Sequence, residues 1–400
     1  MRALIDYRAA LRDRTGVGEY THELVRALLA AFPPDDAHHP TAGSGQRAIA
    51  APPRLDLTLF SSSWKDRLKP AADLAGAATV DRRVPVRVLN YAWHRLQWPP
   101  AEEIAGGAFD LTHSMHPLML PARNAAHVVT VHDLDFLAHP ERTRAEIRRD
   151  YPALARDHAR RADAVIVISH FTAREVERHL GVDAGRIAVC PPGAPDWKPR
   201  ERPPASGYLL CVGTLEPRKN IGGLLDAFEW MLETVSHRSA SEGGNGVPEL
   251  LLAGRATDEA GVWLERIARP PLAGRVRHVG YVDPARRPAL YEGARLLVQP
   301  SLNEGFGLTA LEAMTMGVPV AASDRGALPE VLGDAGPLFD PEDPVEIGAE
   351  ILRMIDDDAF AGACAAKGVV RAREYSWGRT AHKVYAAYEL AIERAKARAN

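Results

Sequence analysis

Short runs of β-branched residues and leucine alternate along the whole chain with amphipathic stretches. This alternation predicts parallel β-strands joined by helical crossovers. The expected strands are Ala3 to Asp6, Leu55 to Phe60, Leu111 to Ser114, Val128 to His132, Ala164 to Ser169 and Ile187 to Cys190, then Tyr208 to Val212, Glu249 to Ala253, Val276 to Val279, Leu296 to Gln299, Val318 to Ala322 and Pro337 to Phe339. The pattern therefore predicts an α/β protein whose two halves each form a Rossmann-type sheet.

A proline-rich segment separates the two halves. Pro191 to Pro195 and Arg200 to Ser206 have a composition that resists both a helix and a central strand. We therefore expect a first domain over residues 1–195, a second over 205–375, and a helix with one apolar face over 376–400. Residues 33–53 and 236–247 lack an apolar period and are expected to form surface loops.

Bulk composition narrows the class of protein. A chain of 400 residues exceeds what one hydrophobic core organises, and 46% hydrophobic with 25% charged residues is typical of a globular protein. A net charge of −3 provides no positive field for nucleic acid, so no nucleic-acid partner is expected. Cys190, Cys211 and Cys364 lack the spacing of a zinc site. Without an export signal or a spanning apolar run, the expected compartment is cytoplasmic.

The segment from Pro300 to Pro319 follows an expected strand and leads into a helix. Ligands of open parallel sheets bind beyond the carboxyl ends of strands, where a helix N-terminus offers N–H groups to an anion. The glycines would let a phosphate oxygen reach the backbone, and carboxylates accept hydrogen bonds from vicinal hydroxyls. The segment predicts a sugar-diphosphate site made of Glu304, Gly305, Phe306, Gly307, Leu308, Thr309 and Glu312. Considered alone, Glu304 could instead cap the helix, and Glu312 could be a solvated or salt-bridged residue of that helix.

A second loop, from Thr214 to Asn220, also follows an expected strand and precedes a helix. Arg218 and Lys219 at a helix start oppose the helix dipole, which is unfavourable unless an anion is bound. The loop therefore predicts a phosphate contact, although both side chains could simply point into water.

The first half offers weaker signals. Gly16 and Gly18 follow the first strand, and His132 ends another strand at its carboxyl end. Two glycines allow a loop to approach a ligand, and a histidine can bond a sugar hydroxyl. An ordinary tight turn explains the two glycines about equally well, and a structural histidine is the commoner interpretation of His132.

Together these motifs resemble the retaining glycosyltransferases of the GT-B fold, fourth sequence family, a group typified by bacterial mannosyl- and glucosyltransferases. The resemblance is strongest over Gly213 to Ala227 and Pro300 to Asp340. It implies two Rossmann-like domains that face a central cleft, with the acceptor bound by the first and the nucleotide sugar by the second. It also implies that the final helix packs back on the first domain.

The resemblance assigns roles to individual residues. Glu304 and the amides of Gly305 to Gly307 would hold the donor sugar, the Leu308 and Thr309 amides the diphosphate, and Glu312 the ribose. The remaining donor contacts would be Arg218 and Lys219 on the leaving phosphate, Tyr281 beside the base, His132 on the sugar, and Gly16 with Gly18 facing the diphosphate. Many members carry arginine where this chain has Thr214, so either Arg218 or the Thr214 hydroxyl would have to supply that phosphate contact.

The resemblance also implies a reaction, with Glu304, Lys219, Arg218 and His132 as the catalytic group. A hexose, mannose as the first expectation, would pass from GDP-mannose or a UDP-sugar to a hydroxyl of a glycan or a lipid-linked sugar, as in polysaccharide biosynthesis. In the expected front-face mechanism a departing phosphate oxygen takes the acceptor proton, without a metal and without a cofactor beyond the nucleotide sugar. Asp133-Leu134-Asp135 spells the metal motif of the other glycosyltransferase fold, but it lies in the wrong domain for that use.

Other functions share the same donor site. A GT-B sugar phosphorylase or nucleotide-sugar hydrolase differs only in what attacks, and a non-catalytic nucleotide-sugar-binding protein would need no attack at all. A dehydrogenase is disfavoured because Glu19 occupies the final glycine position of the dinucleotide motif. One stretch of the first half is both basic and aromatic, which suggests peripheral contact with the inner face of a membrane, with domain packing as the alternative. It consists of Arg82, Arg83, Arg87, Trp93, His94, Arg95, Leu96 and Trp98.

Overall fold

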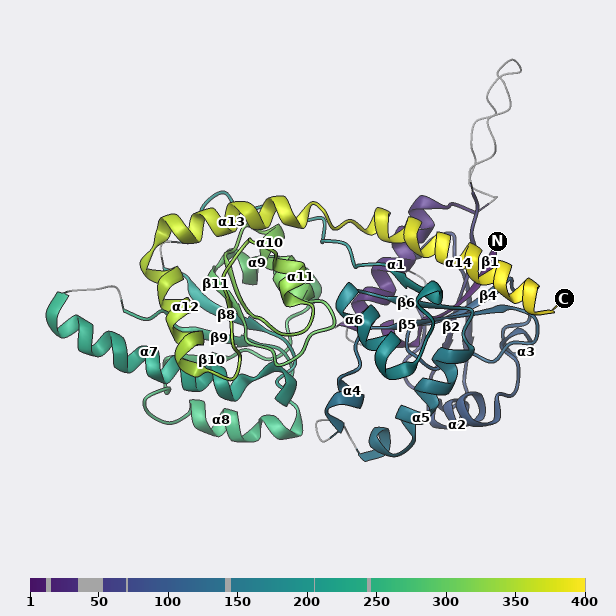
Figure 1. Ribbon diagram of the computed structural model, residues 1–400, viewed down its shortest axis with the longest axis horizontal. Coiled ribbons are helices and arrows are strands. Elements are labelled where there is room, and N and C mark those ends of the chain that lie inside the picture. The colour runs from purple at the N-terminus through teal and green to yellow at the C-terminus, as the bar shows by residue number, and fades with distance from the viewer. Residues whose placement is uncertain are drawn as a thin grey trace, which may run out of the picture. The chain divides into compact units, whose positions relative to one another are not determined.

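The computed structural model describes residues 1–11, 16–34, 53–69, 71–140, 145–204, 206–242 and 246–399. The chain divides into two compact units, Met1–Gly193 with Ser376–Asn400 (unit 1) and Ala194–Tyr375 (unit 2). Each unit is built on one parallel sheet with helices on both faces, so the expected α/β class with two Rossmann-like domains is confirmed (Figure 1).

Unit 1 contains a seven-stranded parallel sheet in the order β3-β2-β1-β4-β5-β6-β7. Its strands are β1 (Arg2–Asp6), β2 (Asp56–Ser62), β3 (Ala78–Arg82), β4 (Leu111–Ser114), β5 (Ala126–Val131), β6 (Ala164–Val167) and β7 (Ile187–Val189). Buried apolar side chains such as Leu4, Val129 and Val165 explain why these runs form central strands. In the register, Leu4 of β1 lies opposite Thr58 and Thr112. The strand order reverses between β1 and β4, which is where ligands bind in such sheets.

Strand β3 was not among the expected strands. Among the described strands it pairs only with β2, and all of its residues are exposed or half-buried. Because an edge strand of this kind buries little, the sequence of β3 lacks the apolar run that identified the central strands.

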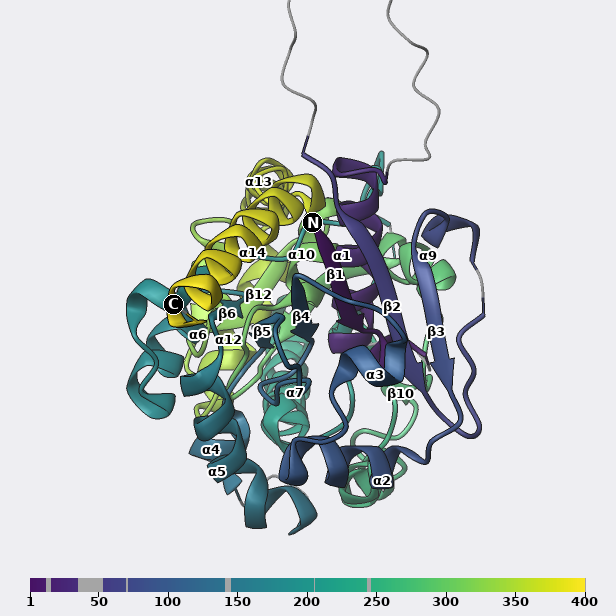
Figure 2. The same ribbon diagram turned by 90° about the vertical axis from the view of Figure 1, so that its right-hand side faces the viewer.

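Helices cover both faces of the unit 1 sheet. They are α1 (Val17–Ala31), α2 (Val86–Tyr91), α3 (Ala101–Ala105), α4 (Asp135–Ala138), α5 (Ala145–Arg161), α6 (His170–Glu175) and α14 (Trp377–Ala399). Figure 2 shows α1 and α14 on one side of the sheet and α2, α3 and α5 on the other. The final helix is held from within its own unit, because the Tyr388 hydroxyl lies 2.7 Å from Nδ1 of buried His113 and the Thr380 hydroxyl donates to the Pro191 carbonyl.

Unit 2 repeats the plan with a six-stranded parallel sheet in the order β10-β9-β8-β11-β12-β13. Its strands are β8 (Tyr208–Val212), β9 (Leu250–Ala253), β10 (Val276–His278), β11 (Ala294–Gln299), β12 (Val320–Ser323) and β13 (Leu338–Phe339). The order reverses between β8 and β11, so the loops that follow these two strands flank the expected ligand position. Both loops carry residues that the sequence predicted for the donor.

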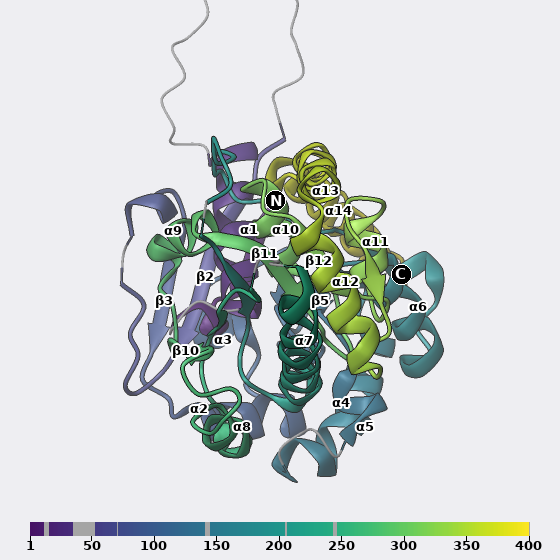
Figure 3. The same ribbon diagram turned by 90° about the vertical axis from the view of Figure 1, so that its left-hand side faces the viewer.

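The unit 2 helices are α7 (Ile221–Glu242), α8 (Gly261–Ile267), α9 (Arg287–Glu292), α10 (Leu308–Thr315), α11 (Leu328–Leu332), α12 (Pro344–Asp356) and α13 (Asp358–Ala372). Figure 3 shows α7, α8 and α12 on one side of the sheet and α9, α10 and α11 on the other. Leu252 of the sheet, Phe228 of α7 and Ile351 of α12 belong to one buried cluster. Each such side chain contributes about 1.5–3 kcal/mol on burial, which holds the strand ends at fixed positions.

The loop expected over residues 236–247 is wrong in its first half, because α7 continues to Glu242. Ala, Glu and Arg favour helix, and an amphipathic helix that is already formed extends at little cost. Most of the loop expected over 33–53 lies outside the described residues. None of the helices in the described part of the chain combines the length and the apolar character that crossing a bilayer requires.

Candidate active site

The two loops that follow β8 and β11 lie against each other in unit 2. The Leu302 amide donates to the Arg218 carbonyl at 2.9 Å, and Nη1 of Arg218 donates to the Asn303 carbonyl at 3.0 Å. These bonds join the basic loop to the Glu304 loop at the point where the strand order reverses. The loop positions follow from adjacent parallel strands, whose carboxyl ends meet at one edge of the sheet.

Glu304 is the centre of the polar contacts in these loops. Its side chain is 8% exposed, Oε1 forms an ion pair with Lys219, and Oε2 lies 3.0 Å from Nη1 of Arg218. The Ser301 hydroxyl donates to Oε1 at 2.7 Å, and the Gln299 amide nitrogen lies 3.3 Å from the same oxygen. The buried carboxylate therefore holds both basic side chains of the β8 loop.

The charge of Glu304 is well defined. Burial raises the pKa of its carboxyl, but Lys219 and Arg218 lower it by more, and the net pKa is about 2. Glu304 is therefore an anion at neutral pH. Its ion pairs offset the unfavourable interaction of Arg218 and Lys219 with the dipole of the helix that starts beside them. Glu304 carries one negative charge and the loop carries two positive ones. Glu216 supplies the other negative charge, because its Oε1 lies 2.9 Å from Nη2 of Arg218.

Helix α10 begins at the end of this loop and directs its N-terminus toward the same region. Gly307 is the N-cap with φ 114°, a left-handed conformation that favours glycine, and a Cβ there would lie 2.7 Å from a methyl of Leu328. The buried Phe306 ring packs edge-on against Tyr375, so only the backbone of Phe306 is suited to bind a ligand. The Thr309 hydroxyl donates to the Gln299 side chain at 3.0 Å.

Glu312 lies one turn inside α10 and is also ion-paired. One of its carboxylate oxygens contacts Arg287, and the other accepts a 2.7 Å hydrogen bond from the Tyr291 hydroxyl, both from α9. The Glu312 side chain is 9% exposed. Glu304 and Glu312 thus form two separate buried carboxylate clusters on the same loop-helix segment, which matches the salt-bridged alternative for Glu312 while leaving further lone pairs on its oxygens.

The other residues predicted for the donor in unit 2 lie at the same edge of the sheet. Half-buried Thr214 follows Gly213, and Tyr281 follows β10 with the Arg255 guanidinium 5.1 Å from its ring centre. A Cβ on Gly254 would lie 1.8 Å from the Gly213 carbonyl oxygen, so glycine is required where these two loops touch. Thr214 therefore lies on a tightly packed backbone.

In unit 1, Gly16 and Gly18 are required for different structural reasons. Gly16 is the N-cap of α1 with φ 48°, whereas a Cβ on Gly18 would lie 2.7 Å from the Ala9 carbonyl oxygen. Gly16 thus serves the turn, and Gly18 lets α1 approach the chain closely.

His132 follows β5, and its ring packs edge-on against Tyr20. Its Nε2 lies 3.2 Å from the Met115 carbonyl, so Nε2 carries the proton and Nδ1 is the acceptor nitrogen of the ring. Burial lowers the pKa of His132 to about 4, so the ring is neutral at pH 7.

The sequence did not single out the residues that orient the two glutamates. Gln299 and Ser301 flank the end of β11, within five residues of Glu304, and Arg287 and Tyr291 are spaced i, i+4 on α9. The i, i+4 spacing of a cation and a hydroxyl was a usable signal for one helix face. Their partner on α10, however, is a tertiary contact.

The described residues contain no group of three or more His, Cys, Asp or Glu side chains able to hold a metal ion. Asp133 accepts from the Asp135 amide at 3.2 Å, which is a turn contact at the start of α4. The three cysteines are buried and unpaired.

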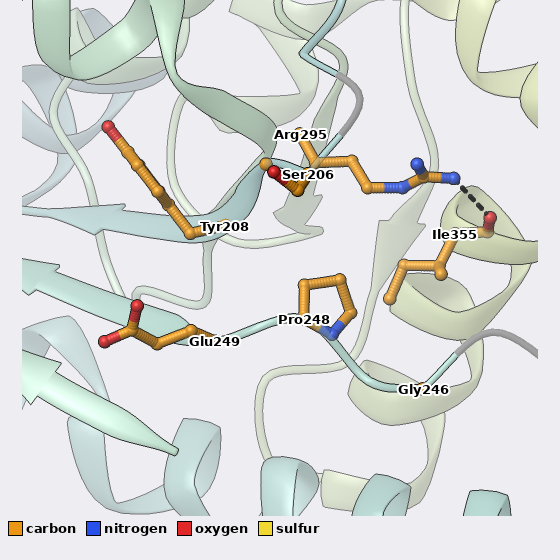
Figure 4. Close-up of a pocket in the computed structure, with 8 residues that line it drawn as sticks. Ser206, Tyr208, Gly246, Pro248, Glu249, Arg295 and Ile355 are labelled. Carbon is orange, nitrogen blue, oxygen red and sulfur yellow. Dashed lines mark hydrogen bonds between the residues drawn. The ribbon is translucent and has the colours of Figure 1, made fainter. Parts of the chain in front are cut away.

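A cavity of about 430 Å³ in unit 2 lies away from these loops. It is lined by Ser206, Gly207, Tyr208, Gly246, Pro248, Glu249, Arg295 and Ile355 (Figure 4). These residues stand at the amino ends of β8, β9 and β11, the edge opposite to Glu304. The cavity is therefore separate from the candidate site.

The sequence and the fold both match known enzymes. Residues 206–357 match the family described as glycosyl transferases group 1, and residues 47–196 match glycosyltransferase family 4. The O-antigen chain mannosyltransferase B of Escherichia coli is 34% identical over 400 residues, covering 94% of this chain and 96% of that relative.

Solved structures share the architecture. Sucrose-phosphate synthase from Thermosynechococcus elongatus has a TM-score of 0.73 at 21% identity, covering 97% of this chain and 98% of that one. A structure of Anabaena HepE in complex with UDP and glucose has a TM-score of 0.65 at 15% identity, covering 96% and 98%. At such identities the likeness shows the fold alone. The chain belongs to the group 1, family 4 glycosyltransferases and has their GT-B fold.

Proposed function

We propose that this glycosyltransferase moves a mannosyl group from GDP-mannose to a hydroxyl of a glycan or lipid-linked sugar, with retention of anomeric configuration and without a metal ion. The observation that carries the proposal is the buried Glu304 carboxylate held between Lys219 and Arg218 at the switch point of the unit 2 sheet. The mannosyl choice rests on the mannosyltransferase that is 34% identical.

The polar groups of unit 2 suit a sugar diphosphate. Lys219, Arg218 and the first amides of α10 supply positive charge and N–H donors for the phosphates, and Glu304 accepts hydrogen bonds from the sugar hydroxyls. When a diphosphate binds, the two cations exchange part of their contact with Glu304 for the phosphate oxygens. The same groups then stabilise the negative charge that develops on the leaving diphosphate.

Glu304 is better suited to binding than to nucleophilic attack. A carboxylate whose pKa is about 2 and whose oxygens meet two cations and a serine hydroxyl is a weak nucleophile. We therefore propose front-face attack, in which the departing phosphate oxygen takes the acceptor proton. Detection of a glycosyl-enzyme adduct by intact-mass spectrometry would overturn this mechanism.

Arg218 is the proposed replacement for the arginine that many family members carry at the position of Thr214. Its guanidinium already lies 3.0 Å from Glu304 and from the Asn303 carbonyl, whereas the Thr214 hydroxyl is a short and uncharged donor. In unit 1 neutral His132, with Nδ1 as acceptor, suits a hydroxyl of the donor sugar. Tyr281, Gly16 and Gly18 keep their proposed contacts with the base and the diphosphate.

Glu312→Gln is expected to raise the KM for the nucleotide sugar about 10–100-fold while kcat stays within about threefold, because a charged hydrogen-bond acceptor for the ribose is lost away from the reacting atoms. Steady-state kinetics with varied donor and saturating acceptor measure both constants. Tyr291→Phe is the matched control, because it removes a hydrogen bond to Glu312 but keeps the carboxylate. An equal fall in kcat and kcat/KM with an unchanged KM would contradict the ribose role.

The proposed reaction is tested by turnover with defined donors. We expect GDP-mannose, rather than UDP-glucose or UDP-galactose, to give an α-linked product that proton NMR identifies, with the same rate in EDTA. A rate that depends on free phosphate would indicate a sugar phosphorylase, and donor consumption unaffected by any acceptor would indicate a hydrolase. A β-linked product would refute retention.

We further propose that the enzyme works at the cytoplasmic face of a membrane through an aromatic-basic surface of unit 1. Trp64, Tyr91, Leu96 and Trp98 are 58–70% exposed, and Lys65, Arg83 and Arg87 are exposed within the same segment, residues 64–98. Trp and Tyr prefer the headgroup level, and each cation near an anionic surface adds about 1 kcal/mol. Trp93 and His94, which the sequence also suggested for this contact, are buried and take no part.

The triple variant Trp64→Ser, Tyr91→Ser, Trp98→Ser is expected to lose most sedimentation with vesicles that contain about one third anionic lipid. Val262→Ser and Val370→Ser, which alter exposed apolar residues of unit 2, serve as controls and should sediment like the unmodified protein. If the unmodified protein does not sediment at low salt, the surface does not bind lipid.

A further inference from the structure

A second cavity, of about 550 Å³, lies in unit 1 and is crowded with arginine. Its lining includes His127, Asp163 and five arginines, Arg160, Arg161, Arg186, Arg394 and Arg398. The arginines come from the end of α5, from the turn before β7 and from α14, which packs over β5 and β6 (Figure 2). One hollow thus gathers side chains from three separate stretches of the sequence.

The cavity is remote from the reaction. His127 stands near the start of β5, whereas His132 follows the end of the same strand. At about 3.3 Å per residue, five residues of strand separate the two positions by roughly 16 Å. The arginine cavity therefore lies at the amino edge of the sheet, opposite to the loops that are expected to meet the donor.

Within the described part of the chain, acidic side chains balance only two of the five lining arginines. Asp163, whose side chain is 4% exposed, is engaged by Arg398 at 2.8 Å, and Arg161 meets Asp157 at 2.9 Å. The remaining lining cations are Arg160, Arg186 and Arg394. Each of these three bonds to backbone carbonyl oxygens and forms no ion pair within the described part of the chain.

Carbonyl bonding explains only part of this arrangement. Arg186 donates to the Arg160 and Ala162 carbonyls at the end of α5, and Arg394 donates to the Asp163 and Gly185 carbonyls. Such bonds complete a helix C-terminus, but each guanidinium has five N–H groups and a full positive charge. A bound anion would lower the repulsion among these like charges, which water screens only in part because Arg186 and Arg394 are half-buried.

The backbone is also adapted to one of these cations. Gly181 has φ 66°, and a Cβ there would lie 2.7 Å from Nη2 of Arg160. The glycine both permits the left-handed turn and leaves the space that the guanidinium occupies.

We propose that this arginine cavity binds a phosphate-bearing anion, such as a diphosphate, at a site separate from the donor site. Several planar guanidinium groups match the three or more oxygens and the double charge of a phosphate group better than those of a single carboxylate. The bound anion would link α14 to α5 and to the turn before β7. Because these elements belong to one unit, occupancy is expected to stabilise the packing of the final helix.

Inorganic pyrophosphate is the probe, and its binding is located by hydrogen exchange with mass spectrometry because it also binds near Lys219. We expect added protection in residues 158–163, 184–187 and 391–398. Arg394→Gln should weaken this protection and the calorimetric affinity at least about tenfold, since one charged donor is lost. Arg394→Lys, which keeps the charge but not the planar fork, should lose less.

The matched control is Arg295→Gln in the unit 2 cavity of Figure 4. Arg295 also bonds a carbonyl, that of Ile355 at 2.7 Å, and a carboxylate, that of Asp358 at 2.8 Å, and its replacement should leave the unit 1 protection unchanged. A second experiment replaces pyrophosphate with vesicles that contain phosphatidic acid. If the cavity is protected by these vesicles but not by pyrophosphate, and Arg394→Gln abolishes the protection, the ligand is a lipid phosphate. Protection confined to residues 213–220 and 300–309, with neither probe protecting the cavity, overturns the site. If the unmodified protein shows the cavity protection but does not turn over the donor, the proposed function is contradicted and the second site is not.

Discussion

Glu304→Gln is expected to lower kcat about 10²–10³-fold and to destabilise the unliganded protein by about 3–5 kcal/mol. The kinetic loss follows from removing an acceptor for the sugar and from releasing the cations that it positions. The stability loss follows because Lys219 and Arg218, whose side chains are 15% and 19% exposed, lose the carboxylate that balances them. Turnover assays and urea unfolding monitored by circular dichroism measure the two effects.

A nucleoside diphosphate should recover more stability in this variant than in the unmodified enzyme, because its phosphates supply the missing negative charge. Glu216→Gln is the matched control: Glu216 also pairs with Arg218, but its side chain is 33% exposed. The control should lose less than about 1 kcal/mol and retain most of kcat. Equal stability losses for the two variants would mean that Glu304 is not the anchor of this cluster.

The fold could be predicted from the sequence because its central strands are short, fully buried and apolar. Leu210 and Val298, for example, lie in strands that alternate with amphipathic helices, and this pattern determines a parallel sheet. Elements that bury little escaped prediction. Strand β3 is held mainly by backbone pairing with β2, and the end of α7 lacks an apolar face.

The candidate site was predictable where chemistry is local. Glu304, the glycines after it and the α10 N-terminus are contiguous in sequence, and the switch point of the sheet brings the Arg218 loop beside them. The supporting contacts were not predictable, because Arg287 approaches Glu312 from another helix. The ion pair between Lys219 and Glu304 also joins residues far apart in sequence, so only the fold shows that the basic loop is neutralised before any ligand binds.

Acidification is expected to unfold unit 1 because it holds four buried or half-buried histidines in their neutral form. Burial is the main cause that lowers the pKa of His94 and His113 to about 3, and that of His132 and His158 to about 4. Their neighbours favour the neutral ring: Nδ1 of His158 accepts from the Met119 amide at 2.9 Å, and Nδ1 of His94 is buried with no hydrogen-bond partner among the described residues.

The sign of the pH dependence follows from these values. Above pH 6.5 the histidines are neutral in both states, so they add no pH dependence. Between about pH 6.5 and 4 the unfolded chain binds protons that the folded unit does not, so stability falls as the pH falls. The limiting slope is about 1.4 kcal/mol per pH unit for each histidine, or about 5 kcal/mol per pH unit for all four. Below about pH 3 this contribution levels off.

Urea unfolding at pH 7.5, 6.5 and 5.5 tests this expectation, with unit 1 followed by pulsed hydrogen exchange at one common labelling pH. The urea midpoint of peptides from β4 and β5 should be lowest at pH 5.5. His158→Gln is the informative variant, because the glutamine oxygen can still accept from the Met119 amide but cannot be protonated. In this variant the slope of the free energy of unfolding with pH should decrease by the equivalent of about one proton. Equal midpoints at pH 7.5 and 5.5 in the unmodified protein would show that these histidines titrate normally in the folded state.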